Sequence, residues 1–330
     1  MAAWSERILI EKIRKSCKKK DKGLLKSIGD DCCEVVAPGP FLISTDSLVD
    51  GIHFDRGFHS AHLLGRKSIA VNLSDIAAMG GTPRFILLSL CLPADLEWEW
   101  ISSWLDGVLE ILHEFDCILI GGDTVKAKEL VFTVTVLGEP APTGAIYRNT
   151  AGPGDSIWVS GTLGSAGAGL QLLRNKQNPQ NKVLFDGLEV LLAAHLDPAP
   201  QVELGLKLAA SGMVTAMQDI SDGIATDLAH ICKASQVSAY VEANALPFLP
   251  ELPLAAAVLE VDVESLILRS GEDYQLVFTV KNGVEAEFLK ELETYSDTLM
   301  KIGEIRAGQG VFLQRKDGET EEISFQGYEH

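Results

Sequence analysis

Apolar residues fall into short runs along this chain, and the residues between the runs are mostly glycine, proline or polar. Continuous apolar or β-branched runs predict four strands, at 41–46, 85–93, 117–124 and 130–139. Two longer stretches predict helices, at 60–80 and 96–115. Because strands and helices intermix, the chain is expected to have an α/β or α+β fold.

The pattern breaks at Pro140, Pro142 and Gly144, just before a GPGD turn at 152–155. A chain of 330 residues is long enough for two domains. We therefore expect an N-terminal domain at 1–145 and a C-terminal domain at 146–330, each a mixed sheet with helices on one face. Beyond the break, strands are predicted at 156–161, 239–243, 274–280 and 300–305, helices at 201–212 and 222–234, and a polar surface loop at 174–186.

Composition excludes some classes of partner. Hydrophobic residues make up 46% of the chain, charged residues 22%, and the formal net charge is −18. Nucleic acid and anionic membranes would repel such a chain, so neither is an expected partner. No stretch approaches the ~20 apolar residues that a membrane span needs. None of the six cysteines forms a CxxC pair, which favours free thiols and a cytoplasmic location.

Nine aspartates lie in short clusters, most of them beside glycine. They are Asp30, Asp31, Asp46, Asp50, Asp75, Asp123, Asp155, Asp219 and Asp222. Converging carboxylates repel each other unless cations lie between them. Oxygen ligands of this kind suit Mg²⁺, and Mg²⁺ held by carboxylates commonly serves phosphate chemistry. The clusters therefore predict a magnesium site.

Each cluster also has a structural interpretation. A helix over 68–79 would place Asp75 on a buried surface, where its charge needs a cation or an arginine. We expect Asp46 and Asp123 to end buried strands, and Gly121 and Gly122 before Asp123 would let a phosphate approach the backbone. A plain turn with an Asx hydrogen bond is the alternative at Asp123.

Two further segments allow a structural or a phosphate-binding interpretation. Asp219, Ser221 and Asp222 precede a predicted helix, where they would cap its N-terminus or bind a metal and phosphate. The glycine-rich run 161–169 would form a phosphate nest or allow tight helix packing. Asp155 is expected to be a turn residue. P-loop and ordinary kinase signatures do not occur in the sequence.

Seven motifs in order carry a resemblance to a known family. They are IGDD, TDSLVDGIHF, NLSDIAAMGG, GGDT, the R-x₄-PGD run from Arg148, DISDG and GEDYQL. Together they closely resemble the thiamine-monophosphate kinase family, within the ATP-binding superfamily of aminoimidazole ribonucleotide synthetase and selenophosphate synthetase. The resemblance covers the chain from about residue 28 to Tyr328. It implies an ATP-dependent phosphorylation of thiamine monophosphate to thiamine diphosphate by direct transfer, and a homodimer paired through the N-terminal domain.

The resemblance also implies roles for single residues, by motif match. Mg²⁺ would be held by Asp30, Ser44, Thr45, Asp46, Asp75, Asp123, Asp219 and Asp222. ATP would be contacted by Gly122, Asp123, Arg148 and Ser221. Thiamine monophosphate would be contacted by His53, Glu272 and Tyr328. The roles of Asp31, Asp50 and Asp55 stay undecided, and no residue is assigned as a general base.

Two departures from the family pattern affect the substrate region. The family more often has GGEDYEL where this chain has SGEDYQL, so Ser270 adds a side chain and Gln275 removes a charge. Two alternative functions stay open at this point. One is another ATP-dependent reaction of the same superfamily, and the other is non-catalytic binding of Mg²⁺ or nucleotide.

Overall fold

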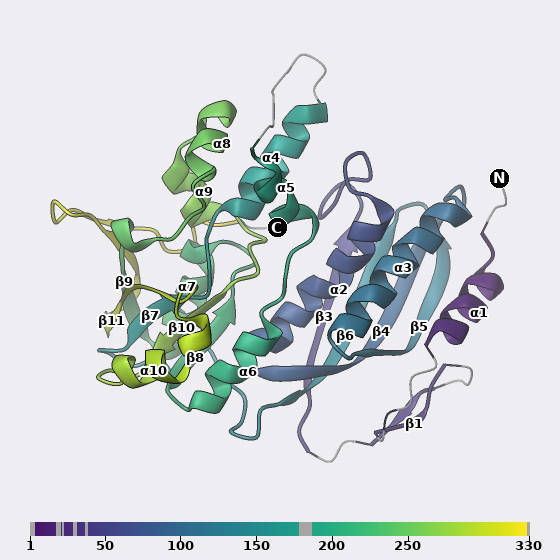
Figure 1. Ribbon diagram of the computed structural model, residues 1–330, viewed down its shortest axis with the longest axis horizontal. Coiled ribbons are helices and arrows are strands. Elements are labelled where there is room, and N and C mark those ends of the chain that lie inside the picture. The colour runs from purple at the N-terminus through teal and green to yellow at the C-terminus, as the bar shows by residue number, and fades with distance from the viewer. Residues whose placement is uncertain are drawn as a thin grey trace. The chain divides into compact units, whose positions relative to one another are not determined.

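The computed structural model describes residues 4–17, 21, 23–28, 32–36, 39–177 and 187–328. The chain forms two compact units. Unit 1 comprises Met1–Ile76 and Gly81–Pro140, and unit 2 comprises Ala77–Gly80 and Ala141–His330. Each unit is built around its own sheet, and Figure 1 shows the elements of both. The boundary near residue 145 and the functional division between the two domains stay predictions.

Unit 1 contains a four-stranded mixed sheet. Its strands are β3 (Leu42–Val49), β4 (Gly81–Pro93), β5 (Ile118–Ala127) and β6 (Val131–Pro140). They lie in the order β3-β6-β4-β5, with β4 and β5 parallel and the other neighbours antiparallel. A separate two-stranded ribbon pairs β1 (Leu24–Lys26) with β2 (Glu34–Val35), and α1 (Glu6–Ser16) precedes it.

Two helices, α2 (Ala61–Ala78) and α3 (Trp98–Glu114), cover one face of this sheet (Figure 1). The Trp104 ring of α3 stacks on Phe132 of β6 with ring centroids 4.4 Å apart. The helices meet at glycines, because a Cβ on Gly65 would lie 2.0 Å from the Trp104 carbonyl oxygen and one on Gly107 would lie 2.0 Å from that of His62. This close backbone approach explains why both positions lack a side chain.

The opposite side of strand β3 is polar and accessible. The Ser44 hydroxyl bonds to Asp75 of α2, so the alternate residues Ile43, Thr45 and Ser47 face away from that helix. The Thr45 hydroxyl lies 2.9 Å from that of Thr135 on β6. Ile43 is 66% exposed, an unusual position for a large apolar side chain.

Unit 2 contains a seven-stranded mixed sheet. Its strands are β7 (Ser156–Val159), β8 (Val214–Asp219), β9 (Val237–Glu242), β10 (Leu276–Val280), β11 (Met300–Ala307), β12 (Gly310–Gln314) and β13 (Thr320–Glu322). They lie in the order β13-β12-β9-β11-β7-β10-β8. Only β12 and β9 pair in parallel among the described neighbours.

Helices of unit 2 pack on this sheet through a buried apolar cluster, to which α7 contributes Ile224, Leu228 and Ile231. The helices of the unit are α4 (Ser165–Gln177), α5 (Glu189–Leu196), α6 (Val202–Ser211), α7 (Ile224–Ser235), α8 (Leu252–Leu259), α9 (Val263–Arg269) and α10 (Glu285–Glu291). Of these, α4, α5, α7, α8 and α9 contribute residues to the cluster. Two 3₁₀ turns, Ala243–Ala245 and Glu293–Tyr295, complete the unit. No helix in the described part of the chain is long and apolar enough to span a membrane.

The structure confirms the predicted mixture of sheets and helices and corrects three local predictions. Asp46 and Asp123 do not end their strands, because β3 continues to Val49 and β5 to Ala127. Polar residues after each apolar run suggested a strand end, but in β3 they form cross-strand pairs such as that of Ser47 with Thr133, 2.7 Å apart. The predicted loop 174–186 begins inside α4, which extends to Gln177, and 178–186 lie outside the described residues.

Candidate functional site

The DISDG motif forms the connection between β8 and α7 in unit 2. The N-cap of α7 is Gly223, so none of the polar residues of the motif occupies the predicted N-cap position. Instead Asp227, in the first turn, accepts hydrogen bonds from the amides of Asp222 and Gly223 at 3.0 and 3.1 Å. The capping interpretation of Asp219, Ser221 and Asp222 is therefore wrong, and the capping carboxylate belongs to a residue that the sequence did not single out.

The carboxyl group of Asp227 in this segment has a strongly shifted pKa. It is fully buried, and Gln218 Nε2 donates to its Oδ1 at 2.7 Å. Burial raises the pKa of Asp227 well above its ordinary value, the charges of Asp219 and Asp222 raise it further, and the two amide hydrogen bonds lower it. Asp219 and Asp222 therefore both lie within electrostatic reach of Asp227, at one end of β8.

The loop 270–275 is joined to the DISDG loop by backbone hydrogen bonds. The Glu272 amide donates to the Ser221 carbonyl at 2.8 Å and the Tyr274 amide to the Ile220 carbonyl at 2.9 Å. In return, the Ile220 amide donates to the Gln275 carbonyl at 2.7 Å. Glu272 and Tyr274 have left-handed φ values of 66° and 47°. Residues other than glycine rarely adopt this backbone conformation, and where they do it often marks a functional loop.

Asp273 anchors the same loop to the N-terminus of α4. Its carboxylate accepts the amides of Gly164 at 2.7 Å and Ala166 at 3.1 Å. Burial raises the pKa of Asp273 to about 7, and the helix amides lower it less than burial raises it. Amides of the glycine-rich run are thus occupied by an internal carboxylate.

Helix packing accounts for other glycines of that run, since a Cβ on Gly169 would lie 2.0 Å from the Leu191 carbonyl oxygen. Gly167 packs against a side chain, because a Cβ added to Gly167 would lie 2.2 Å from the Cβ of Ser270. The packing interpretation of 161–169 is therefore confirmed.

The C-terminal segment also reaches the DISDG loop. The Tyr328 amide donates to the Asp222 carbonyl at 2.8 Å, and the Gly327 amide donates to Thr226 Oγ1 at 2.9 Å. A Cβ on Gly327 would lie 2.3 Å from the Asp222 carbonyl oxygen, so only glycine permits this approach. The Tyr328 side chain is 51% exposed. Residues far apart in sequence, Asp222, Glu272 and Tyr328, therefore belong to segments that meet in unit 2.

Arg148 lies near the same loop. Its carbonyl accepts a hydrogen bond from the Ser235 hydroxyl at 2.7 Å, and its side chain is exposed. Burial lowers the pKa of His230, the charge of Arg148 lowers it further, and Asp222 raises it. Arg148 and Asp222 therefore both lie within electrostatic reach of His230 on α7.

Unit 1 places a second group of predicted residues on β3 and α2. The Ser44 hydroxyl donates to Asp75 Oδ2 at 2.6 Å. Asp46 lies on the same side of β3 as Ser44, two residues further along. Ser44, Asp46 and Asp75 thus share one side of the sheet. The Thr45 hydroxyl points the other way and bonds to the Val134 carbonyl at 3.1 Å.

Asp123 lies further across the sheet. Asp46 is paired with Val134, which is paired with Leu88, which is paired with Gly122. Three strand spacings of ~4.8 Å separate the backbones of Asp46 and Gly122 by roughly 14 Å. Gly122 has φ 155°, and a Cβ there would lie 1.9 Å from the Leu88 carbonyl oxygen, so strand packing already requires this glycine.

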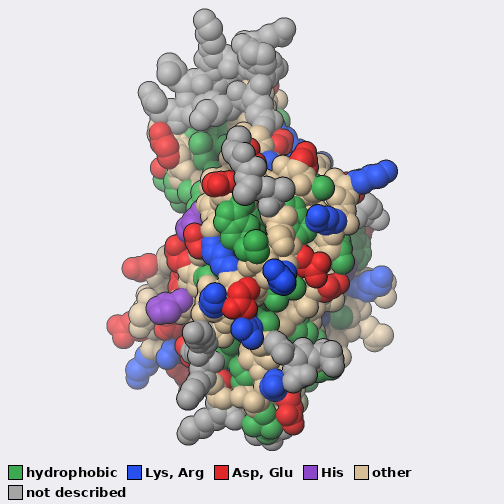
Figure 2. All heavy atoms as spheres, turned by 90° about the vertical axis from the view of Figure 1, so that its right-hand side faces the viewer, with side chains coloured by type: hydrophobic (Ala, Val, Ile, Leu, Met, Phe, Trp, Pro, Cys, Tyr) green, Lys and Arg blue, Asp and Glu red, His purple; other side chains and the backbone are tan. Residues whose placement is uncertain are grey.

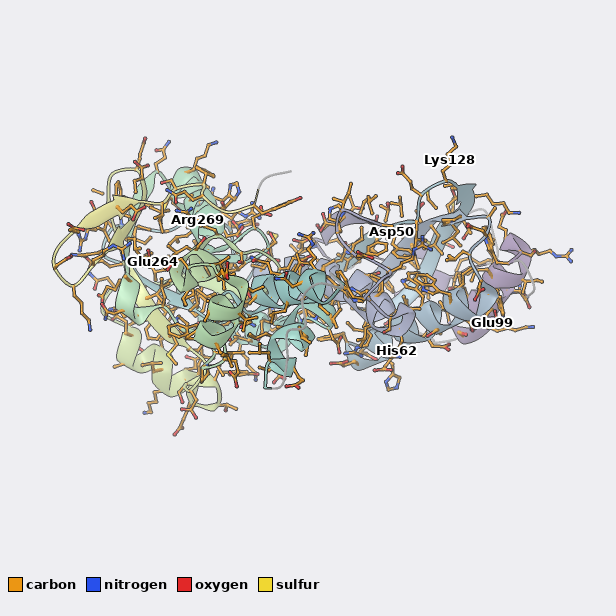
Figure 3. All side chains as sticks on the ribbon, turned by 90° about the horizontal axis from the view of Figure 1, so that it is seen from above. Asp50, His62, Glu99, Lys128, Glu264 and Arg269 are labelled. Atoms are coloured by element: carbon orange, nitrogen blue, oxygen red, sulfur yellow. The ribbon has the colours of Figure 1, made fainter. Side chains whose placement is uncertain are left out.

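His53 lies in the turn that follows β3. Its Nδ1 accepts the Val49 amide at 3.1 Å, so the neutral ring carries its proton on Nε2. Asp50, labelled in Figure 3, accepts a hydrogen bond from Arg56 Nε at 2.7 Å. Asp55 accepts the Gly57 amide at 2.7 Å in a turn. Local partners therefore account for these two undecided aspartates.

Ser270 and Gln275, the two residues of loop 270–275 that depart from the family pattern, both contact other residues of unit 2. The Ser270 side chain packs against Gly167, as described above. The Gln275 Oε1 atom accepts a hydrogen bond from the Ser160 hydroxyl at 2.8 Å. Asp155 behaves as the predicted turn residue, because its carboxylate accepts the Gly152 amide at 2.8 Å and the Thr215 hydroxyl at 2.7 Å.

Within the residues that the structure describes, no three His, Cys, Asp or Glu side chains form a group able to hold a metal ion. The predicted ligands are divided between the two units, and Asp30 and Asp31 lie outside the described residues. The donors present are carboxylate and hydroxyl oxygens, which fit Mg²⁺. Sequence analysis missed Asp227 and left Asp273 without a role. It also missed His195 of α5, whose Nδ1 lies 2.9 Å from Glu272 Oε2. Asp227 had one detectable signal, its place in the first helical turn after the motif.

An open hollow of about 860 Å³ lies elsewhere, along α1 of unit 1. Figure 2 shows this side of the molecule, where hydrophobic side chains lie among lysines and arginines. The hollow is lined by Glu6, Arg7, Ile8, Ile10, Glu11, Lys12, Arg14, Lys15, Ser16 and Trp98. It includes none of the predicted site residues that the structure describes.

Comparison with known proteins identifies the class to which this fold and site belong. Residues 29–139 match the AIR synthase related protein N-terminal domain, and residues 152–316 match the corresponding C-terminal domain. The chain is 37% identical over 320 residues to the thiamine-monophosphate kinase of Haemophilus influenzae, covering 94% of this chain and 93% of the relative.

Two solved structures are also similar over nearly their whole length. The crystal structure of thiamine-monophosphate kinase from Stenotrophomonas maltophilia has a TM-score of 0.82 at 36% identity and covers 96% of this chain and 98% of that one. The structure of AaThiL complexed with AMPPCP and TMP has a TM-score of 0.74 at 29% identity and covers 96% of each chain. The chain belongs to the thiamine-monophosphate kinase family of AIR synthase related proteins.

Proposed function

We propose that this protein is a kinase that transfers the γ-phosphoryl group of ATP to thiamine monophosphate, giving thiamine diphosphate and ADP. One observation carries this assignment: the chain is 37% identical over 94% of its length to a thiamine-monophosphate kinase. The similar structure complexed with AMPPCP and TMP agrees with it. The reaction would contribute the phosphorylation step of thiamine diphosphate biosynthesis.

The proposed transfer is direct. An oxygen of the acceptor phosphate forms a bond to the γ-phosphorus while the bond from that phosphorus to the β,γ-bridging oxygen breaks, and ADP leaves with that electron pair. The acceptor phosphate is largely ionised at neutral pH, so the step needs no general base. The main barrier is charge, since the two substrates together bring about six negative charges.

We propose that Mg²⁺ is the required cofactor. When bound, it would neutralise phosphate charge and allow the substrates to approach. In unit 1 the proposed carboxylate ligands are Asp46 and Asp75. In unit 2 they are Asp219 and Asp222. The hydrogen bond from Ser44 to Asp75 orients one of these carboxylates. The remaining proposed ligands are Asp30, Ser44, Asp123 and the backbone carbonyl of Thr45, since the Thr45 hydroxyl points to the other side of β3.

ATP contacts are proposed for Gly122, Asp123, Arg148 and Ser221. The exposed Arg148 side chain would meet phosphate oxygens, because a guanidinium donates several hydrogen bonds to them in a fixed geometry. The Ser221 backbone is fixed by the Glu272 amide, so its hydroxyl would be presented from a defined loop.

Thiamine monophosphate contacts are proposed for His53, Glu272 and Tyr328. The Glu272 carboxylate suits the cationic thiazolium or the amino group of the pyrimidine. The half-exposed Tyr328 ring would stack on an aromatic ring of the substrate. The backbone hydrogen bonds of Glu272 and Tyr328 to the DISDG loop support substrate contacts close to Ser221, a proposed ATP contact of unit 2.

We further propose a homodimer formed through the polar side of the unit 1 sheet. The exposed Ile43, together with Thr45 and Ser47, would be covered by the same surface of a second copy. Ile43→Asp should shift the mass measured by light scattering from that of a dimer to that of a monomer. A wild-type protein that is monomeric at every concentration tested would refute this pairing.

Activity on a panel of phosphate acceptors tests the proposed function. With ATP and Mg²⁺, ADP release should depend on thiamine monophosphate and stop when EDTA removes the metal. Activity on another acceptor with none on thiamine monophosphate would refute the substrate. Binding of ATP without any acceptor-dependent ADP release would refute catalysis.

A further inference from the structure

We propose that His195 is a positioning residue for thiamine monophosphate, and that it acts by fixing the carboxylate of Glu272. The inference rests on the proposed function, in which Glu272 contacts the acceptor substrate. His195 is not part of any motif that carries the family resemblance. It comes from α5, 77 residues before Glu272 in the chain (272 − 195).

The contact is close and largely shielded from water. His195 Nδ1 lies 2.9 Å from Glu272 Oε2, and the His195 side chain is only 1% exposed. The Glu272 side chain remains 26% exposed, so part of it is accessible from outside unit 2. This short nitrogen–oxygen contact is an ion pair when the imidazole is protonated, and its length is compatible with donation of an Nδ1–H to the carboxylate.

Helix packing fixes the position of the imidazole. Leu191 and His195 lie one helical turn apart on the same face of α5, and both are buried. A Cβ on Gly169 of α4 would lie 2.0 Å from the Leu191 carbonyl oxygen and 3.3 Å from the His195 Cβ. The two helices therefore cross closely at Gly169, and His195 is presented from a rigid element.

Glu272 is held at two points. Its backbone is fixed by the hydrogen bond to Ser221 and by the neighbouring Asp273, which binds the N-terminus of α4. These bonds set the left-handed backbone at φ 66° but do not set the side-chain rotamer. The contact with His195 Nδ1 supplies that second restraint, so its loss should leave the loop in place and let the carboxylate adopt more rotamers.

This division of roles predicts a selective kinetic effect. A mobile Glu272 carboxylate would bind the acceptor less well, because each binding event would have to restrict its rotamers again. ATP contacts would be unaffected, since they are proposed for other residues. The KM for thiamine monophosphate should therefore rise while the KM for ATP stays near its wild-type value.

Three substitutions at one position test this. His195→Leu removes the donor, and His195→Gln moves an amide donor to the place of Nε2. Both should raise the KM for thiamine monophosphate at least about tenfold. His195→Asn places an amide N–H near the position of Nδ1 and should restore most of the affinity. The Asn and Gln variants are close in size and polarity, so their comparison stays informative if His195→Leu does not fold.

His62 provides a matched control. Its Nε2 lies 3.0 Å from Glu110 Oε2 on the surface of unit 1, and Figure 3 shows its ring projecting from α2. His62→Leu removes a histidine–glutamate pair of similar length and should leave both KM values unchanged. Glu272→Gln combined with His195→Leu should be little worse than Glu272→Gln alone if His195 acts through Glu272.

The outcomes separate this inference from the proposed function. Wild-type protein that fails to phosphorylate thiamine monophosphate would overturn the proposed function and this inference with it. If the wild type is active, three results would overturn the inference and leave the proposed function standing. They are an unchanged KM for thiamine monophosphate in the folded His195→Gln variant, an equal rise in the KM values for both substrates, and a KM of His195→Asn no lower than that of His195→Gln.

Discussion

At the residue scale, three aspartates of this protein differ in their surroundings and in the roles these suit. Asp75 accepts a hydroxyl hydrogen bond and shares its surface with Asp46. Asp227 is fully buried and Asp273 is partly buried, and both accept backbone amides that fix two loops. The first is suited to ligand contact and the other two to support. These roles are distinguished by the burial and the partners of each carboxylate, since the residue type is the same in all three.

Substitution of Asp75 tests the ligand role. Asp75→Asn keeps the size of the side chain and removes its charge, so turnover should fall at least about 100-fold while the unfolding midpoint changes little. Asp50→Asn is the matched control, since Arg56 already pairs with that carboxylate. Steady-state rates at saturating Mg²⁺ measure both. Near-normal turnover of Asp75→Asn would refute its role in metal binding.

Asp273 makes stability depend on pH. Its pKa rises from an ordinary 3.8 to about 7 in the folded protein, so the folded state binds a proton that the unfolded state has lost between these values. This contribution to the free energy of unfolding is fully present below pH 4 and declines as pH rises to 7, by up to about 4 kcal/mol.

Asp273→Asn removes this titration. The variant should therefore gain stability relative to wild type between pH 5 and pH 8. Urea unfolding of both proteins at the two pH values measures the difference. If the difference in unfolding free energy between the two proteins is the same at pH 5 and pH 8, the predicted titration of Asp273 is contradicted.

At the element scale, glycine contacts determine how closely helices approach. Gly65 and Gly107 let the backbones of α2 and α3 touch in unit 1, and Gly169 does the same for α4 and α5 in unit 2. The first contact holds α2, which carries Asp75, and the second holds α5, which carries His195. Close helix packing therefore supports both groups of candidate residues.

Gly65→Ala should destabilise unit 1. The added Cβ would lie 2.0 Å from the Trp104 carbonyl oxygen, so the helices must separate, at a cost of about 1–3 kcal/mol in the free energy of unfolding. Gly152→Ala is the control, because its Cβ would meet Asp155 Oδ2 at an ordinary 3.7 Å. Chemical denaturation compares them. Equal stability of the two variants would contradict the close approach of α2 and α3.

The sequence predicted most elements and missed contacts between distant ones. Apolar runs located the strands around 85–93 and 130–139 because burial and β propensity are local properties. Strand ends at Asp46 and Asp123 were wrong because cross-strand partners of polar residues are not visible locally. The contact of His195 with Glu272 had no sequence signal, since α5 and loop 270–275 meet only through packing.

At the scale of the whole molecule, the candidate residues are divided between two compact units. Unit 1 supplies Ser44, Asp46 and Asp75, whereas unit 2 brings the segments of Asp222, Glu272 and Tyr328 together. With a net charge of −18, the protein itself adds to the negative charge of its two substrates. The proposed direct phosphoryl transfer would require cations in such surroundings, and the aspartate-rich motifs are the proposed ligands for them.

The fate of the γ-phosphoryl group tests the central claim most directly. Purified wild-type protein should be incubated with Mg²⁺, thiamine monophosphate and ATP labelled at the γ-phosphorus, and the products separated. We predict that the label appears in thiamine diphosphate, with one ADP formed for each labelled product and none retained on the protein. Label recovered only as inorganic phosphate, on the protein or on another acceptor would contradict the assignment.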